Sequence, residues 1–158
     1  MAKAAKPVPN GYHTITPQLT LDNAAQTMDW YKKALGAEEV SRSVGPDGKI
    51  MHAELKIGDS RFMVNDVIMG KGPQAYGGSP AGLWLYVENS DTLFNRAVTA
   101  GAKVQTPIAD QFWGDRAGSI ADPSGYTWWI ATRKEDLTPA EMQQRSAEFF
   151  KQMASTHR

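Results

Sequence analysis

Apolar and polar residues alternate near the start of the chain and predict its first strand. From residue 15 to residue 21 the odd-numbered positions carry apolar side chains, whereas the even-numbered positions carry threonine or glutamine. This period of two is typical of a strand with one apolar face, so we expect a strand over residues 13–21. Apolar residues then recur at helical spacing, with Asp22 as the capping residue and Gly36 as the stop, which predicts a helix over residues 22–35.

Turn residues divide the next segment into three strands. Gly45-Pro46-Asp47-Gly48 and Gly58-Asp59 have the composition of hairpin turns. The stretches around them are therefore expected to form strands over residues 37–44, 49–57 and 60–65. With the first strand and helix they complete one βαβββ unit.

After a loop rich in glycine and proline, over residues 67–81, the same order of elements begins again. Leu19-Thr20-Leu21-Asp22-Asn23 has a counterpart 66 positions later in Leu85-Tyr86-Val87-Glu88-Asn89. Repetition at a fixed distance indicates a duplicated structural unit. We therefore expect a second βαβββ unit, with a helix after its first strand. Its strands are predicted over residues 82–87, 102–108, 117–121 and 126–132.

These elements predict a chain in three parts. Residues 1–11 are expected to be a flexible lead-in, residues 12–136 a single domain with units over about 12–66 and 82–132, and residues 137–158 a C-terminal helix and tail. Thr138-Pro139-Ala140-Glu141 combines a capping hydroxyl, a proline at the first helical position and a glutamate that reaches back, so a helix of about four turns should follow. Its apolar stripe could dock on the body of the protein or on a second subunit. The stripe consists of Met142, Phe149, Phe150 and Met153.

Composition narrows the classes of partner. The 158 residues, of which 41% are hydrophobic, suffice for one sizeable core. Lys plus Arg and Asp plus Glu number 17 each, so no net field attracts a polyanion and we expect no nucleic-acid partner. The apolar stretches are far too short to span a membrane, and the absence of cysteine excludes disulfides and thiolate chemistry. We expect a soluble, cytoplasmic protein.

Four motifs on this duplicated frame resemble a known family. They are Thr16-Pro17-Gln18-Leu19, then His52-Ala53-Glu54-Leu55 with Ile57-Gly58-Asp59-Ser60, then Phe112-Trp113-Gly114-Asp115-Arg116, and finally Asp122-Pro123-Ser124-Gly125. In this order they resemble the vicinal oxygen chelate superfamily of glyoxalases, bleomycin-resistance proteins and extradiol dioxygenases, and within it the PhnB-like branch. The resemblance covers roughly residues 12–136. It implies an α+β fold in which the two units form a curved, cup-like mixed sheet with helices outside and a ligand inside.

The resemblance also gives the positions where metal-dependent relatives place their ligands. By register these are Thr16, Glu54, Gly82 and Trp129. Only Glu54 has a side chain suited to ligation, and one carboxylate does not hold an ion against water. The sequence therefore predicts no metal ion and no cofactor.

An enzymatic alternative stays open at this stage. His52 and Glu54 share one strand face and are the candidates for acid–base catalysis. With Gln18 they could also be imagined around a divalent ion, as in a metal-dependent glyoxalase-like lyase, isomerase or dioxygenase. A hydrogen-bonded pair in a polar cavity is the simpler interpretation of His52 and Glu54.

Aromatic residues occupy the inner positions of the second unit. Trp84, Tyr86 and Trp129, with Trp113 from a nearby loop, predict an aromatic wall that would bind a small aromatic or cationic molecule. Glu54 could supply a counter-charge, and Arg116 could either reach a ligand anion or pair with a carboxylate of the protein. A cup filled by its own side chains, acting only through partner contacts, is a third possibility. The predicted ligand-binding residues are Gln18, His52, Glu54, Trp84, Tyr86, Trp113, Arg116 and Trp129.

A homodimer is the expected assembly. Relatives of this fold commonly complete or buttress their cups across a two-fold axis, and the apolar stripe of the C-terminal helix could serve as part of such an interface.

Overall fold

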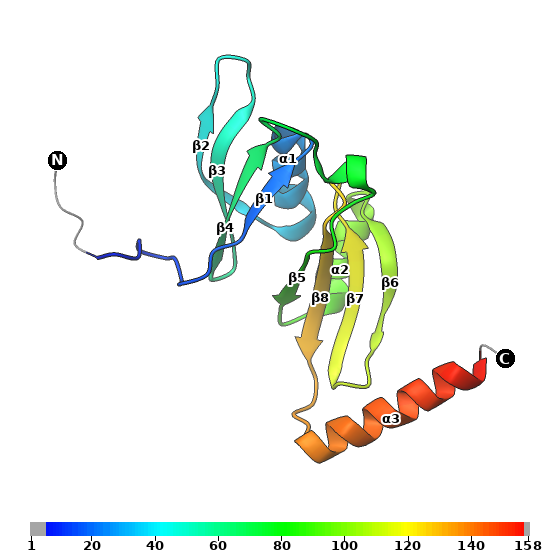
Figure 1. Ribbon diagram of the computed structural model, residues 1–158. Helices are drawn as coiled ribbons and strands as arrows, with labels where there is room; N and C mark the ends of the chain where they lie inside the picture. Colours follow the sequence, from blue (N-terminus) through cyan, green and yellow to red (C-terminus); the bar gives the residue numbers. More distant parts are fainter. Residues whose placement is uncertain (1–5, 157–158) are drawn as a thin grey trace.

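Two units with the same order of strands form the body of the protein in the computed structural model, which describes residues 6–156 (Figure 1). The first unit comprises β1 (Gln18–Leu21), α1 (Ala24–Leu35), β2 (Glu38–Val44), β3 (Ile50–Ile57) and β4 (Ser60–Asp66). A linker with the short 3-10 helix η1 (Pro73–Tyr76) leads to the second unit, which comprises β5 (Gly82–Tyr86), α2 (Ser90–Thr99), β6 (Lys103–Asp110), β7 (Asp115–Ala121) and β8 (Thr127–Arg133). The C-terminal helix is α3 (Pro139–Thr156). The predicted α+β class and the two βαβββ units are confirmed.

Each unit has its own four-stranded mixed sheet. The strand orders are β1-β4-β3-β2 and β5-β8-β7-β6, and in each sheet the first pair is parallel and the others antiparallel. The register repeats as well, because Gln18 lies opposite Met63 in the first sheet and Trp84 opposite Trp129 in the second. Both members of the second pair are 66 positions after those of the first.

The first strand is shorter than expected. We predicted a strand over residues 13–21, but β1 begins at Gln18. In the parallel register of β1 with β4, residue 15 would lie opposite Ser60, where β4 begins, so the residues before it have no strand to pair with. Pro17 also has no N–H to donate, although its carbonyl accepts a hydrogen bond from the Met63 N–H at 2.8 Å.

Asparagines, rather than Asp22, cap the two helices of the units. The Asn23 side chain accepts a hydrogen bond from the Gln26 N–H at 3.2 Å, and Asn89 does the same for the Thr92 N–H at 2.9 Å. The Asp22 carboxylate instead accepts a hydrogen bond from the Gln74 N–H at 3.2 Å, which fastens the linker to the first unit. The prediction of Asp22 as the cap was wrong by one residue.

The C-terminal helix begins as its sequence predicts. The Thr138 hydroxyl accepts a hydrogen bond from the Glu141 N–H at 3.3 Å, and the Glu141 carboxylate accepts one from the Thr138 N–H at 2.8 Å. This reciprocal pair is a capping box. In Figure 1, α3 lies beyond the end of β8, away from the first unit.

A shared core joins the two units on the helix side of the sheets. Tyr31 of α1 lies edge-on to Phe62 and Trp128, with ring centroids 5.8 and 5.4 Å away. The buried Asp122 carboxylate accepts hydrogen bonds from the Tyr31 hydroxyl at 2.6 Å and the Trp128 indole N–H at 2.9 Å. The two units therefore share one hydrophobic and hydrogen-bonded centre.

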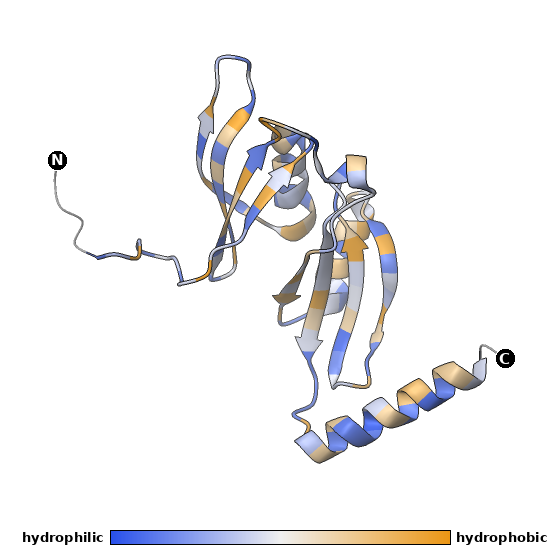
Figure 2. Ribbon diagram, in the orientation of Figure 1, coloured by the Kyte–Doolittle hydropathy of each residue, from blue (hydrophilic) through white to orange (hydrophobic). Residues whose placement is uncertain are grey.

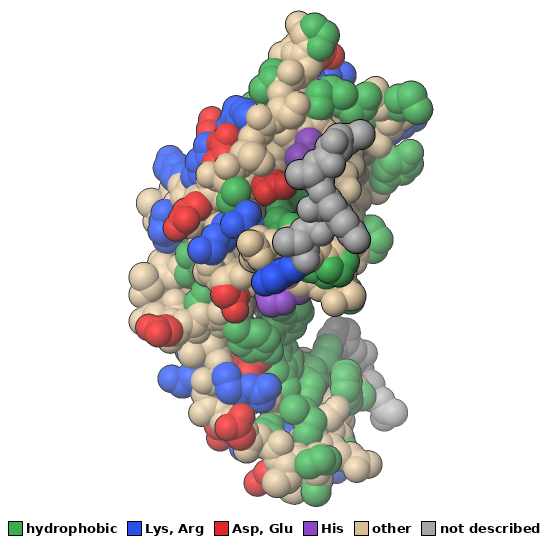
Figure 3. Space-filling model, turned by 90° about the vertical axis from the view of Figure 1, so that its left-hand side faces the viewer, with side chains coloured by type: hydrophobic (Ala, Val, Ile, Leu, Met, Phe, Trp, Pro, Cys, Tyr) green, Lys and Arg blue, Asp and Glu red, His purple; other side chains and the backbone are tan. Residues whose placement is uncertain are grey.

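The helices leave one face of the curved sheets open. Along the strands, hydrophobic and hydrophilic residues alternate (Figure 2), and the apolar row packs against α1 and α2. The molecule is hollowed along the side opposite these helices, and hydrophobic side chains gather there as well (Figure 3). Among residues 6–156, no helix has both the length and the apolar character needed to cross a membrane. Of the predicted lead-in, residues 6–11 form neither helix nor strand, and residues 1–5 lie outside the described part of the chain.

Candidate functional site

Four aromatic rings form a continuous surface on the open face of the second unit. We call Trp84, Tyr86, Trp113 and Trp129 the aromatic wall. The Trp84 and Trp129 rings are stacked, with centroids 4.9 Å apart and planes inclined by 5°. Trp113 lies edge-on to both, at 6.1 Å from each. Trp84 and Tyr86 are 44% and 59% exposed, so the protein's own side chains do not fill this face.

Strand register brings the aromatic wall together. In the parallel pairing of β5 with β8, Trp84 lies opposite Trp129. Their neighbours Leu85 and Ile130 also lie opposite each other, Ile130 buried in the core and Leu85 half-buried against it. Trp113 comes from the loop between β6 and β7. Trp128 is buried in the core, as the alternation predicted.

A buried carboxylate, Asp115, lies behind the aromatic wall. Its Oδ2 accepts hydrogen bonds from the Tyr86 hydroxyl at 2.9 Å and from the Trp113 indole N–H at 3.0 Å. Its Oδ1 accepts no well-directed hydrogen bond within residues 6–156, but Arg133 Nε lies 3.2 Å away in an ion pair. Desolvation by burial, followed by the hydrogen bond to Asp115, raises the pKa of Tyr86.

Sequence reasoning did not assign Asp115 or Arg133 to the site. It left Arg116 either to reach a ligand anion or to pair with a carboxylate of the protein. The structure pairs Arg116 with Asp91 of α2 at 2.6 Å and with Asp110 at 3.2 Å. Because adjacent residues of a strand point to opposite faces, Arg116 lies on the helix side and is not brought to the aromatic wall.

The open face of the first unit is polar. His52 Nε2 lies 3.7 Å from Glu54 Oε1, and Arg61 Nη1 lies 3.7 Å from Glu54 Oε2. The Gln18 side chain is not part of this group, since its amide donates to Asn65 Oδ1 at 2.9 Å. Glu54 therefore already has a cation of the protein beside it.

Tyr12 extends this polar group. The Arg61 guanidinium lies over the Tyr12 ring, with its central carbon 5.3 Å from the ring centroid. Desolvation by burial, followed by the proximity of Glu54, raises the pKa of Tyr12. The sequence offered no signal for this contact, because Tyr12 lies before the first strand.

The polar and aromatic groups lie on different sheets of the chain. Within residues 6–156, no hydrogen bond, ion pair or ring contact joins Gln18, His52 or Glu54 to the aromatic wall. Apart from Gln18 and Arg116, the predicted residues thus lie in two half-sites and not in one: His52 and Glu54 on the first unit, and the aromatic wall on the second.

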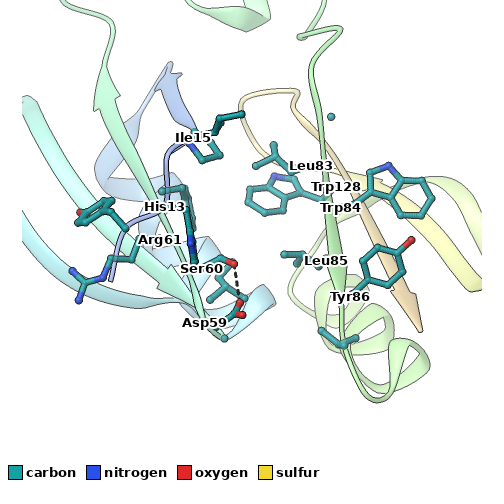
Figure 4. Close-up of a pocket in the computed structure, with 17 residues that line it drawn as sticks. His13, Ile15, Asp59, Ser60, Arg61, Leu83, Trp84, Leu85, Tyr86 and Trp128 are labelled. Carbon is teal, nitrogen blue, oxygen red and sulfur yellow. Dashed lines mark hydrogen bonds between the residues drawn. The ribbon is translucent and has the colours of Figure 1, made fainter. Parts of the chain in front are cut away.

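A cleft that sequence reasoning did not predict separates the two units. It has a volume of about 490 Å³ and lies between β5 and the segment that leads into β1. Leu83 and Leu85 point into it from one side, and His13 and Ile15 lie on the other (Figure 4). Trp84 and Tyr86 also belong to its lining, although their rings point away from its centre in Figure 4. No local pattern could reveal this cleft, because it depends on how the units pack.

The residues at the family's ligand positions do not fit a divalent metal ion. In the described part of the chain, no three His, Asp or Glu side chains gather as a metal site. Thr16, Gly82 and Trp129 supply no carboxylate or imidazole, and the cationic Arg61 lies beside Glu54.

Relatives of the chain can be recognised by sequence. An uncharacterised protein of Mycobacterium bovis, Mb0911c, is 41% identical over 135 residues, which cover 82% of this chain and 89% of that protein. The protein YjdN of Escherichia coli is 26% identical over 146 residues, which cover 78% of this chain and 98% of YjdN.

Solved structures share the fold. TioX from Micromonospora sp. ML1 is similar with a TM-score of 0.62 and 24% identity, covering 80% of this chain and all of TioX (100%). The PhnB protein of Bacillus cereus is similar with a TM-score of 0.56 and 20% identity, covering 76% and 99% of the two chains. The model of the Glyoxalase/Bleomycin resistance protein/Dioxygenase superfamily matches residues 12–130. The chain therefore belongs to this superfamily, which its motifs resembled.

Proposed function

We propose that this protein binds a planar aromatic small molecule against the aromatic wall, without a metal ion. The observation that carries the proposal is the parallel Trp84–Trp129 pair on the open face, with Trp84 44% exposed. Flat rings gain from both apolar burial and face contacts on such a surface. The protein would sequester its ligand, as a bleomycin-resistance-like protein does.

The surroundings of Glu54 favour an aromatic ligand over one recognised mainly by its positive charge. A buried carboxylate without a partner would attract a cation. Here the Arg61 guanidinium lies 3.7 Å from a Glu54 oxygen, so part of that attraction is already satisfied. A cationic ring can still bind through its contact with tryptophan faces.

The proposal includes a homodimer, because the aromatic wall is open to solvent in one chain. Enclosed ligand sites bury most of the ligand surface, which a single open face does not do. A second copy that covers this face would enclose the ligand, and its polar half-site of Glu54 and His52 is a candidate for the opposite wall. Phe150 of α3, which is 60% exposed, is a further apolar group for such an interface.

Equilibrium dialysis with two matched probes tests the ligand class. We expect the neutral ring quinoline and the cation N-methylquinolinium both to bind at neutral pH. Trp84→Ala should weaken both by about tenfold, because it removes a stacking surface. Glu54→Gln should weaken only the cation, and by less, since Arg61 shares that carboxylate.

The control is Tyr76→Ala, which removes an exposed aromatic ring of the linker. It should leave both affinities unchanged. Binding that is indifferent to Trp84→Ala, or that depends equally on Tyr76, would contradict the aromatic wall as the site.

A further inference from the structure

Asp115 is a buried carboxylate that accepts hydrogen bonds from two residues of the aromatic wall. Its side chain is 1% exposed at the start of β7. Burying a carboxylate is costly unless charged or hydrogen-bonding partners compensate. Its partners here are Tyr86, Trp113 and Arg133, two of which belong to the aromatic wall.

The two hydrogen bonds converge from different parts of the chain. Tyr86 comes from β5 and Trp113 from the loop before β7, yet both donate to the same oxygen, Oδ2. Hydrogen bonds to a charged acceptor are stronger and more directional than neutral ones. Each bond ties the polar end of a ring, so each ring loses freedom to rotate.

The tied rings flank the stacked pair. Tyr86 lies 6.1 Å from Trp84 at an angle of 25°, and Trp113 stands at 71° to the same Trp84 ring. Within the described residues, Asp115 makes no hydrogen bond to Trp84 or Trp129. Its effect on this stacked pair therefore passes through the rings of Tyr86 and Trp113, which it binds.

We propose that Asp115 is the positioning residue of the aromatic wall, which it fixes by binding the Tyr86 hydroxyl and the Trp113 N–H. Both of these donors are then engaged inside the protein, so Tyr86 and Trp113 present ring faces and not hydrogen bonds to the ligand. Arg133 lies in an ion pair with Asp115 and offsets its charge. The ligand class that follows is a planar ring that needs neither a charge nor an acceptor where it meets Tyr86 and Trp113, an inference that rests on the proposed function.

A ligand-free measurement tests the positioning role. In Asp115→Asn the side chain keeps its size but loses its charge, so the Tyr86 phenol should ionise at a lower pH than in the unchanged protein. Spectrophotometric titration of the tyrosines detects this shift. The shift should disappear when the same substitution is made in a Tyr86→Phe background, which assigns it to Tyr86.

Asp115→Asn should also loosen the wall. The near-ultraviolet circular dichroism of the tryptophans should fall, and the affinity for quinoline should drop by about tenfold. The matched control is Asp91→Asn, which breaks a carboxylate–arginine pair on the opposite face of the same sheet. It should change neither the tyrosine titration nor the quinoline affinity.

A second variant covers the case in which Asp115→Asn does not fold. Tyr86→Phe keeps the ring and removes only its hydroxyl, so it should still reduce the dichroism and weaken quinoline binding. If Tyr86→Phe and a folded Asp115→Asn both leave the dichroism and the quinoline affinity at wild-type values, the inference is overturned while the proposed function stands. If the tyrosine titration and dichroism shift as expected but quinoline does not bind the unchanged protein, the positioning role is supported and the proposed function fails.

Discussion

Two buried aspartates of the second unit show how single carboxylates organise aromatic side chains. Asp115 holds two rings of the open face, and Asp122 holds two rings of the core. Asp122 also accepts hydrogen bonds from the backbone N–H groups of Ser124 and Tyr126, at 2.9 and 3.0 Å. The Asp122 carboxylate therefore stabilises the turn that follows it and also joins the second unit to Tyr31 of the first.

We predict that Asp122→Ala destabilises the protein by about 3 kcal/mol, because it leaves the buried Tyr31 hydroxyl and Trp128 N–H without their acceptor. Urea-induced unfolding measures the change in the free energy of unfolding. Asp136→Ala, which truncates an exposed carboxylate, is the control and should alter stability by less than about 0.5 kcal/mol. Equal effects of the two substitutions would contradict the role assigned to Asp122.

Residue placement within strands could be predicted from the sequence, whereas contacts between distant residues could not. The period of two was enough to separate Trp84 and Trp129 from the apolar rows that pack in the core. The Asp115–Arg133 and Glu54–Arg61 pairs depend on cross-strand register and side-chain reach, which no local pattern encodes. The open-face residues were therefore predictable, but not the charges that surround them.

At the scale of elements, a three-residue ion-pair network fastens the end of α1 to β2. Glu39 accepts hydrogen bonds from Arg42 at Oε1 and Oε2, at 2.6 and 2.8 Å. Lys32 Nζ lies 2.6 Å from the same Oε2. The hydrogen bonds from Arg42, followed by that from Lys32, lower the pKa of Glu39 from 4.5 to about 2.

This network predicts an acid-sensitive contribution to stability. Because the folded-state pKa of Glu39 is depressed, its contribution is present above pH 4.5 and is lost as the pH falls through about 2. Partial exposure to solvent limits this contribution to about 1 kcal/mol. Unfolding experiments across this range should show that Glu39→Gln removes that part of the acid sensitivity. A variant with the same pH dependence as the unchanged protein would contradict the assignment.

The order of helices and strands could be predicted, because turn residues separate them and the second unit repeats the first. The residues at which they begin and end depend on pairing with other strands, which the sequence does not show. Residues 13 and 14 of the predicted first strand have no partner, because they would lie before the start of β4. The equivalent caps Asn23 and Asn89 were visible in the repeat, yet Asp22 is an equally good capping residue by type. The choice between them depends on where the helix meets the sheet.

At the scale of the whole molecule, the open face leads to a prediction about assembly. We expect sedimentation velocity at micromolar concentration to give a homodimer, of about twice the 17.3 kDa chain mass. Phe150→Glu should shift the population towards monomer, whereas Tyr76→Glu in the linker should not. A strictly monomeric protein would contradict this proposal. Packing of the Phe149 ring on the Phe112 ring, with centroids 4.8 Å apart, would then be enough to explain the aromatic residues of α3.

The repeated register has a consequence for how such a protein can change. Gln18, Thr20 and Met63 of the first unit occupy the positions that Trp84, Tyr86 and Trp129 occupy in the second. One duplicated frame thus carries a polar open face in the first unit and an aromatic open face in the second. Neither set of residues belongs to the core that α1 and α2 cover. Successive rounds of mutation could therefore diversify one face while the other and the fold persist, a freedom open to natural selection after a gene duplication and equally to a directed-evolution library.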